Sequence, residues 1–335
     1  MKKTVTIRDV ASVANVSTGT VSMVLNGSGK TSENTKKRVM DVVDRMGYVP
    51  NPYARSLSLS KSYQIGFIVT DLTNPFFGMM VDHIQREVEK HNNSLLVSMT
   101  NNSITKEKST VENYIKRGID GIIIVPAHEQ NADVSHIYKL FDKKIPTVFI
   151  SSHHTGIEQN CIMTDLAAGA LDLTMHLLKT GHKSITLLSG YRGLVLSEER
   201  INGFLQAHRE MNIPVSKDQI IQTDPIYVGG YNAAKQVMQG TTPDAIMCVN
   251  DLVAMGVLTC LREMKLNVPS DVSVTGYDDL IYSSMLDKPL TTVRQPIKKM
   301  AIESVDLLFN LISGKEGLQK PMLLEPEVKI RESSR

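Results

Sequence analysis

The chain has 335 residues, 41% of them hydrophobic, and a formal net charge of +2. This length exceeds one ordinary domain and predicts two or three. The apolar runs fall short of the roughly 18 residues that span a membrane, and the start, MKKTVTIRDV, lacks the apolar segment of a signal peptide. We therefore expect a cytoplasmic protein with no membrane association.

The N-terminal segment begins with a predicted helix. Apolar side chains repeat at the i, i+3, i+4, i+7 spacing of one helix face, at Ile7, Val10, Ala11 and Ala14. Thr6 precedes this face and Asp9 follows three residues later, which is a capping-box pattern. The stretch Asn15-Val16-Ser17 is too short to be anything but a turn.

Two more helices follow this turn. Val21, Val24 and Leu25 mark the second, which ends at the glycine-rich stretch Asn26-Gly27-Ser28-Gly29. The third shows the same helical spacing and is followed by Gly47, with its stripe at Val39, Val42, Val43 and Met46. Two helices joined by about three residues and buttressed by a third predict a helix-turn-helix unit.

The second helix presents small polar side chains that suit contacts with base edges and phosphates: Ser17, Thr18, Thr20, Ser22 and Asn26. A three-helix module that binds another protein is the alternative interpretation. Residues 1–62 contain ten Lys or Arg and four Asp or Glu, a net charge of +6, so the remaining residues carry −4. A basic segment joined to a slightly acidic body favours DNA binding.

The next segment predicts a hinge. Pro50 and Pro52 block helix propagation. Residues 53–59, YARSLSL, form a helix too short to be stable alone in water. A plain linker is the alternative.

From residue 64 the pattern alternates between strands and helices. Continuous apolar runs predict buried parallel strands at 65–69, 94–98, 119–125, 146–150, 184–188, 245–249 and 272–275. Helical stretches are predicted at 76–91 and 106–117. This alternation predicts two α/β lobes, each with a doubly wound parallel sheet, and a cleft between them.

Ligands of such sheets bind beyond the carboxyl ends of the strands. The candidates are the residues that follow each run: Asp71, Asn74, Phe76, Ser151, Ser152, residues 191–200, Asn250, Asp251, Tyr277, Asp278 and Asp279. Their carboxylates, amide, arginine and aromatic faces suit a polyhydroxylated ligand. For Asn250 and Asp251 a helix-capping role is an equal alternative, and Asp165 is predicted to cap a helix.

We predict no metal site and no cofactor. Cys161, Cys248 and Cys260 are odd in number and far apart, so we expect three small buried hydrophobic residues. The adjacent His153 and His154 are expected to be solvated in an exposed loop rather than to bind a metal.

The ordered motifs of the chain resemble the LacI family of bacterial transcription regulators. Those motifs are Val16–Ser22, Leu25-Asn26-Gly27, Gly47–Asn51, Ala54–Leu57, Asn74–Phe77, Asp120-Gly121, Gly181-His182, Ala254–Gly256, Gly276–Asp278 and Leu290–Val293. The resemblance covers essentially the whole chain. It implies an all-α helix-turn-helix head and a two-lobed body like periplasmic binding proteins, with crossover strands near 290–294 and 320–326.

The resemblance also implies a set of residues that bind DNA. They are Thr6, Ile7, Ser17, Thr18, Gly19, Thr20, Ser22, Met23, Asn26, Lys30, Thr35, Asn51, Ala54, Arg55 and Leu57. In this family the hinge folds on operator DNA, and a leucine, matched here by Leu57, wedges between base steps in the minor groove. Met23 stands where many members have an arginine, which predicts a different operator half-site.

A second implied set contacts a small effector: Phe76, Ser151, Leu194, Leu196, Arg200, Asn250, Asp251 and Asp278. Leu194 and Leu196 match positions that are polar in several members, and Ser151 stands near a common aspartate. These departures indicate a pocket more apolar than a monosaccharide site.

The resulting hypothesis is a homodimeric repressor of a carbohydrate-catabolism operon that binds a near-palindromic double-stranded operator and responds to a small sugar-like effector. Its expected domains are a head at 1–50, a hinge at 51–62 and a body at 63–335. Within the body we expect an N-subdomain at about 63–162 and 292–323 and a C-subdomain at about 163–291 and 324–335.

Three alternatives accompany this hypothesis. A regulator of the catabolite-control type would use a protein co-regulator. A solute-binding protein would explain the body but not the basic head. A nucleotide-dependent enzyme is disfavoured because the sequence has neither GxGxxG after a strand nor GxxxxGK[ST], so we expect no enzymatic activity.

Overall fold

The computed structural model describes residues 5–26, 31–48, 61–129, 133–240 and 242–335. The chain folds as two compact units, Met1–Ser62 and Tyr63–Arg335, which we call the head and the body. Among the described residues, no helix is long and apolar enough to cross a membrane.

The head contains the three predicted helices, α1 (Ile7–Val13), α2 (Thr18–Asn26) and α3 (Glu33–Met46). Val10, Val21 and Val39, one from each helix, are fully buried in their common core. The capping box is confirmed: the Thr6 N–H donates to Asp9 Oδ2 at 2.8 Å, and the Asp9 N–H donates to Thr6 Oγ1 at 3.4 Å. The helix-turn-helix prediction is therefore correct.

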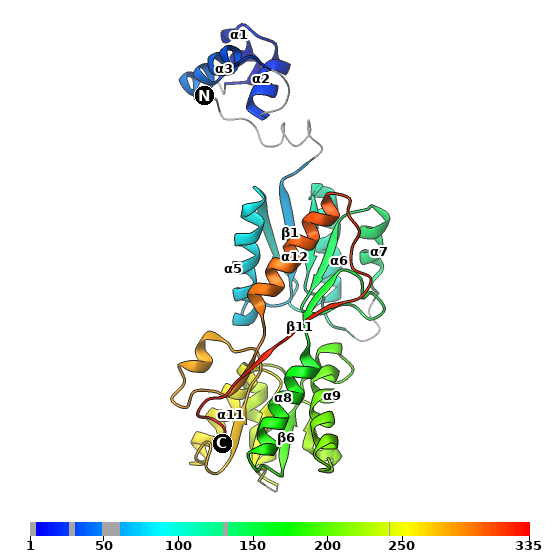
Figure 1. Ribbon diagram of the computed structural model, residues 1–335, viewed down its shortest axis with the longest axis vertical. Coiled ribbons are helices and arrows are strands. Elements are labelled where there is room, and N and C mark those ends of the chain that lie inside the picture. The colour runs from blue at the N-terminus through cyan, green and yellow to red at the C-terminus, as the bar shows by residue number, and fades with distance from the viewer. Residues whose placement is uncertain (1–4, 27–30, 49–60, 130–132, 241) are drawn as a thin grey trace. The chain divides into compact units, whose positions relative to one another are not determined.

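The body begins with a lobe built on a six-stranded parallel sheet, which we call the N-lobe (Figure 1). Its strands are β1 (Gln64–Val69), β2 (Ser94–Met99), β3 (Gly121–Ile124), β4 (Thr147–Ile150), β5 (Cys161–Thr164) and β11 (Met322–Leu324), in the order β11-β5-β4-β3-β1-β2. Four helices cover the sheet: α5 (Pro75–Lys90), α6 (Ile104–Arg117), α7 (Ser135–Asp142) and α12 (Ile297–Ile312).

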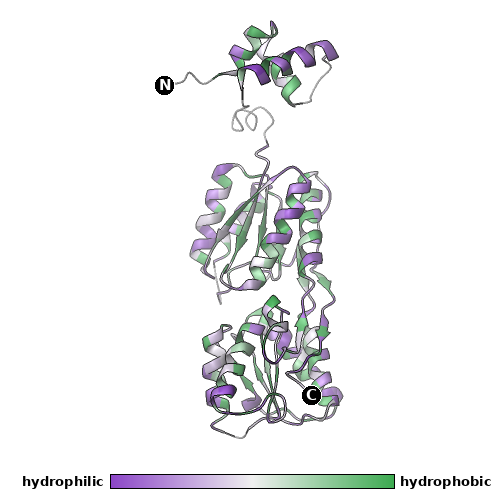
Figure 2. Ribbon diagram, turned by 90° about the vertical axis from the view of Figure 1, so that its left-hand side faces the viewer, coloured by the Kyte–Doolittle hydropathy of each residue, from purple (hydrophilic) through white to green (hydrophobic). Residues whose placement is uncertain are grey.

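Alternation along β1 explains how both faces of this sheet are buried. Ile65 and Phe67 pack in one cluster with residues of α5 and α12, while Ile68 packs in another with residues of α6 and α7. Figure 2 shows the result, with hydrophobic strands enclosed by helices whose outer faces are hydrophilic.

The second lobe, the C-lobe, has a four-stranded parallel sheet. Its strands are β6 (Ile185–Leu188), β7 (Ile220–Ile221), β8 (Ala245–Cys248) and β9 (Ser273–Thr275), in the order β7-β6-β8-β9. Its helices are α8 (Leu166–Lys179), α9 (Val195–Glu210), α10 (Tyr227–Val237) and α11 (Asp251–Glu263), with short 3-10 turns η1 (Lys217–Gln219) and η2 (Ile281–Ser284). Two parallel, helix-covered sheets confirm the predicted fold class.

Three segments connect the lobes. The first runs from β5 into α8, and the other two contain β10 (Thr292–Arg294) and β12 (Glu327–Lys329), which pair in an antiparallel ribbon. The crossover strand that was expected near 290–294 is present as β10. Of the region expected at 320–326, β11 belongs to the N-lobe sheet, and the second crossover strand is β12, just after it.

Candidate functional site

The first candidate surface is the N-terminal half of α2 in the head. Ser17, Thr18 and Gly19 are exposed, and the Ser17 hydroxyl accepts a hydrogen bond from the Thr20 N–H at 3.0 Å, so Ser17 caps the helix. A Cβ added to Gly19 would meet only Ser17 Oγ, at 3.6 Å, so the position has room for a side chain. Met23 is 39% exposed on the same helix.

Several other predicted DNA-contact residues have structural roles in the head. Thr6 caps α1, and Ile7 packs partly buried against the head core. Thr35 pairs its hydroxyl with that of Ser32, the residue that caps α3, at 2.9 Å. Ser22 is half-buried on α2.

The remaining predicted contacts of the head and the hinge fall at the end of α2 or outside the described residues. Asn26 is the last residue of α2. Five residues lie outside the described part of the chain: Lys30, Asn51, Ala54, Arg55 and Leu57.

The second candidate site lies at the carboxyl edge of the C-lobe sheet, as expected for parallel sheets. Arg200 on α9 is 6% exposed, and its guanidinium carbon lies 4.2 Å from the centre of the Tyr277 ring. Its Nη1 donates to the Leu196 carbonyl at 2.9 Å, and its Nη2 lies 3.7 Å from Asp278 Oδ1. The Nε of Arg200 is buried and has no hydrogen-bond partner.

Asp278 follows β9 in a left-handed backbone conformation, with φ of 111°. Gln295, between β10 and α12, donates to its Oδ1 at 2.7 Å. Burial raises the pKa of Asp278 to about 6, although the Arg200 charge and the Gln295 hydrogen bond oppose the rise. A buried carboxyl beside a buried guanidinium is a pattern typical of ligand sites.

Asn250 and Asp251 form structural hydrogen bonds at the start of α11. Asn250 caps the helix, because its side chain accepts from the Val253 N–H at 2.8 Å. Asp251 is fully buried and accepts hydrogen bonds at both oxygens, from Thr292 Oγ1, Ser283 Oγ and the Leu280 N–H. Burial and then the nearby Asp278 charge raise the pKa of Asp251 to about 7.

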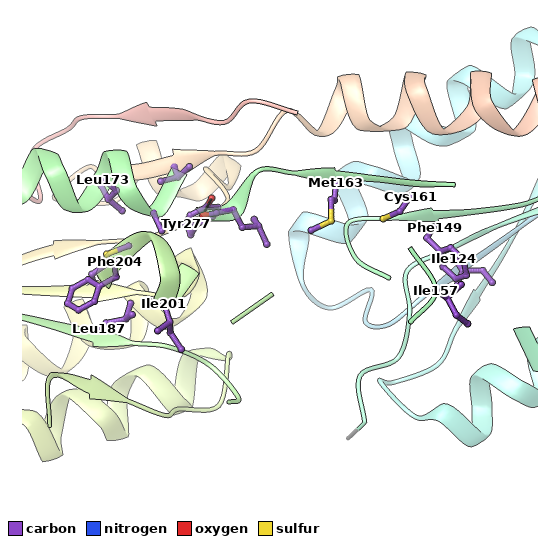
Figure 3. Close-up of a cluster of buried hydrophobic side chains, with 14 of the residues drawn as sticks. Ile124, Phe149, Ile157, Cys161, Met163, Leu173, Leu187, Ile201, Phe204 and Tyr277 are labelled. Atoms are coloured by element: carbon purple, nitrogen blue, oxygen red, sulfur yellow. Dashed lines mark hydrogen bonds between the residues drawn. The ribbon is translucent and has the colours of Figure 1, made fainter. Parts of the chain in front are cut away.

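The other predicted effector residues are dispersed. Phe76, in the first turn of α5, is 4% exposed in the N-lobe core, and Ser151 follows β4, buried, with φ of 70°. Leu194 immediately precedes α9, and Leu196 packs against the hydrophobic cluster of Figure 3. In that view Ile201 and Tyr277 lie in the C-lobe group of side chains, whereas Phe149 and Met163 belong to the N-lobe group.

A cavity of about 490 Å³ lies between the lobes. N-lobe residues on its wall include His128, His153 and His154, and C-lobe residues include Gly193 and Leu194. Of the predicted effector residues, Leu194 alone belongs to this lining.

The expectation for the adjacent histidines is wrong for His154. Its side chain is 5% exposed, and its Nε2 lies 2.8 Å from Glu107 Oε1. Burial raises the pKa of Glu107, but hydrogen bonds from His136 and His154 outweigh it, so the pKa falls to about 2. The sequence pattern missed this arrangement because Glu107 and His136 lie on helices remote in the sequence. The three cysteines are buried, as predicted.

Comparison with known proteins identifies the family. Residues 6–51 match the family model for bacterial regulatory proteins of the lacI family, and residues 174–334 match a periplasmic binding protein-like domain. The chain is 31% identical over 329 residues to the HTH-type transcriptional regulator DegA of Bacillus subtilis (strain 168), covering 98% of each chain. The chain belongs to the LacI family. It is therefore a DNA-binding transcriptional regulator and not an enzyme.

Other similar proteins are also transcriptional regulators. The HTH-type transcriptional repressor PurR of Actinobacillus pleuropneumoniae serotype 3 (strain JL03) is 31% identical over 333 residues and 98% of each chain. The lac repressor dimer bound to operator and the anti-inducer ONPF superposes with a TM-score of 0.87 at 27% identity, over 99% of each chain. The complex of the transcriptional regulator CelR with cellobiose has a TM-score of 0.75 at 25% identity, over 98% of this chain and 99% of that one.

Proposed function

We propose that this regulator is a dimeric repressor whose affinity for operator DNA changes when a small, hydroxyl-rich molecule binds beside Arg200 and Asp278. The observation that carries the proposal is the incompletely paired guanidinium of Arg200. Its Nε has no partner, and its contact with Asp278 is 3.7 Å, too long for a hydrogen bond. A buried donor without a partner costs free energy that a ligand oxygen would recover.

The chemistry around this guanidinium suits a sugar-like molecule. Asp278 accepts hydrogen bonds from hydroxyls, Arg200 donates to them, and the Tyr277 ring is held in place by its hydroxyl, which donates to the Leu166 carbonyl at 3.2 Å. Leu194 and Leu196 add apolar surface near the start of α9. This combination favours a carbohydrate that carries an apolar part over a free monosaccharide.

The relatives support a sugar effector and a dimer. One is a complex of CelR with cellobiose, and another is a lac repressor dimer on its operator with the anti-inducer ONPF. In this chain the head at 1–50 would bind one operator half-site through α2, and the hinge at 51–62 would bind between the half-sites. Two-fold symmetry of a dimer then requires a near-palindromic operator.

The test begins with a thermal-shift screen of the purified protein against mono- and disaccharides, aryl glycosides, sugar phosphates, nucleosides and amino acids. A ligand at 100 times its Kd stabilises the folded state by about 2.7 kcal/mol if it does not bind the unfolded state. We expect a hit among the glycosides.

The hit is then tested with Arg200→Lys, which keeps the charge but removes the forked donor geometry. The matched control is Arg209→Lys, at an exposed position of the same helix. Ligand binding should weaken in the first variant only. A panel without a glycoside hit, or equal binding by both variants, would refute the site.

DNA binding and assembly are tested separately. Selection from random duplexes should recover a near-palindromic site, and sedimentation should give the mass of two chains. Asymmetric selected sites or a monomer in the DNA complex would contradict the proposed dimer.

A further inference from the structure

A buried cluster of Glu107, His136 and His154 lies in the N-lobe, apart from Arg200 and Asp278. The side chains of Glu107 and His136 are fully buried, and that of His154 is 5% exposed. The Nε2 atoms of His136 and His154 lie 2.6 and 2.8 Å from the same carboxylate oxygen, Glu107 Oε1. One potential ligand atom from each of the three residues lies within 4.8 Å of the others.

Three separate elements bring the cluster together. Glu107 is in the first turn of α6, His136 is in the first turn of α7, and His154 is in the loop after β4. The Ala127 N–H fixes the carboxylate by donating to Glu107 Oε2 at 2.6 Å. The donors are therefore held on a rigid scaffold, which favours a defined coordination geometry.

We propose that Glu107, His136 and His154 bind a divalent transition-metal ion, with zinc as the ion of choice, at the N-lobe wall of the cavity between the lobes. Two imidazoles and one carboxylate form a set of ligands that zinc uses. With metal–ligand bonds of about 2.0–2.2 Å, tetrahedral geometry separates ligand atoms by about 3.3–3.6 Å. The present separations of 2.6 and 2.8 Å would therefore have to widen by somewhat less than 1 Å.

Metal binding needs no net proton release if both imidazoles are neutral. Each imidazole then changes tautomer: the proton on Nε2, which now bonds to Glu107, moves to Nδ1 of the same ring, and Nε2 binds the metal. The Nδ1 of His136 is buried and has no partner, so it would need a water molecule as acceptor.

Another histidine, His128, lies on the wall of the same cavity. His128 and His154 line the same cavity, and His128 Nε2 is buried without a hydrogen-bond partner. A buried lone pair without a donor is costly, and a metal ion or a metal-bound water would satisfy it.

The competing explanation is a hydrogen-bonded triad that holds α6, α7 and the loop after β4 together. Calorimetric titration of zinc into the tag-free, chelator-treated full-length protein distinguishes the two. We expect one zinc per chain with a Kd of about 1 µM or tighter. Cobalt, used as a spectroscopic probe, should give visible absorption with an intensity typical of four-coordinate sites.

Variants locate the site. Glu107→Gln and His154→Gln should each weaken zinc binding by more than about 100-fold, since loss of an outer-shell partner alone costs about 10- to 100-fold. The matched controls are Glu112→Gln, at a partly exposed position of α6, and His83→Gln on α5, and both should bind zinc as the parent protein does.

Either of two results would overturn the proposal. The first is the absence of stoichiometric zinc binding by the unmutated protein, which does not depend on any variant folding. The second is unchanged binding in a Glu107→Gln, His154→Gln double variant that unfolds cooperatively. Both leave the proposed effector site at Arg200 unaffected.

Discussion

Gln295 and Asp278 are joined by a hydrogen bond of 2.7 Å from the Gln295 amide nitrogen to the Asp278 carboxylate. The amide oxygen of the same Gln295 accepts from Thr164 Oγ1, also at 2.7 Å. Thr164 ends β5 in the N-lobe sheet, whereas Asp278 follows β9 in the C-lobe sheet. One buried amide therefore connects the N-lobe sheet with the carboxyl group beside Arg200.

Replacing this amide should destabilise the body. Gln295→Met keeps the side-chain length but leaves Asp278 and Thr164 without their buried partner. Each unpaired buried group costs about 1–3 kcal/mol, so the free energy of unfolding in urea should fall by about 2–6 kcal/mol. Gln206→Met, at an exposed position of α9, is the control. A decrease below about 0.5 kcal/mol would mean that the hydrogen bonds of Gln295 do not stabilise the body.

The raised pKa of Asp251 makes stability depend on pH. Between its usual pKa of 3.8 and about 7, the folded state binds a proton that the unfolded state has released. Stability therefore falls as the pH rises through this range, and one pKa unit corresponds to about 1.4 kcal/mol.

The variant Asp251→Asn removes this titration. From pH 5 to pH 7, the unfolding free energy of the parent protein should fall by at least about 1 kcal/mol relative to that of this variant. The exposed Asp172→Asn serves as control. A difference that is constant with pH would contradict the assignment.

The packing of α8 against α9 depends on Gly203. A Cβ at this position would lie 2.2 Å from the Ala167 carbonyl oxygen and 2.8 Å from the Leu171 nitrogen, both backbone atoms that cannot turn away. Gly203→Ala should lower the free energy of unfolding by about 3 kcal/mol or more. At Gly240 an added Cβ meets only the Val237 oxygen, at 3.7 Å, so Gly240→Ala should change stability little. Equal effects in urea denaturation would disprove the close approach.

The fourth prediction concerns Leu57 of the hinge. It rests on the family resemblance. Leu57→Ala should weaken binding to the selected operator by about 10-fold or more, because the unstacked base step loses its apolar wedge. Binding to nonspecific DNA should be retained, since it depends on phosphate contacts. Fluorescence anisotropy at one salt concentration measures both, and an equal loss on the two DNAs would exclude the wedge.

Local sequence patterns were sufficient for the helices of the head, for α5 and α6, and for several helix-capping residues. The pair of Thr6 and Asp9 predicted the start of α1, and the apolar run at 65–69 predicted β1, because caps and buried strands are encoded by near neighbours. Asp165 was likewise placed correctly as the cap of α8.

Contacts between remote residues could not be predicted in this way. Asp251 bonds to Thr292, 41 residues away, and His154 bonds to Glu107, 47 residues away. Nothing in the residues beside Asp251 or His154 indicates these partners, because the fold alone brings them together. The adjacent pair His153-His154 suggested solvent exposure. In the structure, however, His154 is buried beside Glu107 of α6.

The three segments that connect the lobes also determine when each lobe can be completed during synthesis. The N-lobe sheet lacks its edge strand β11 until residue 324 has been made, and β10 lacks β12 until residue 329. The Ser333 hydroxyl then bonds to the Val274 carbonyl in the C-lobe. Both lobes therefore depend on residues after 320 for their last contacts, so incomplete chains expose unpaired strand edges, which favours aggregation.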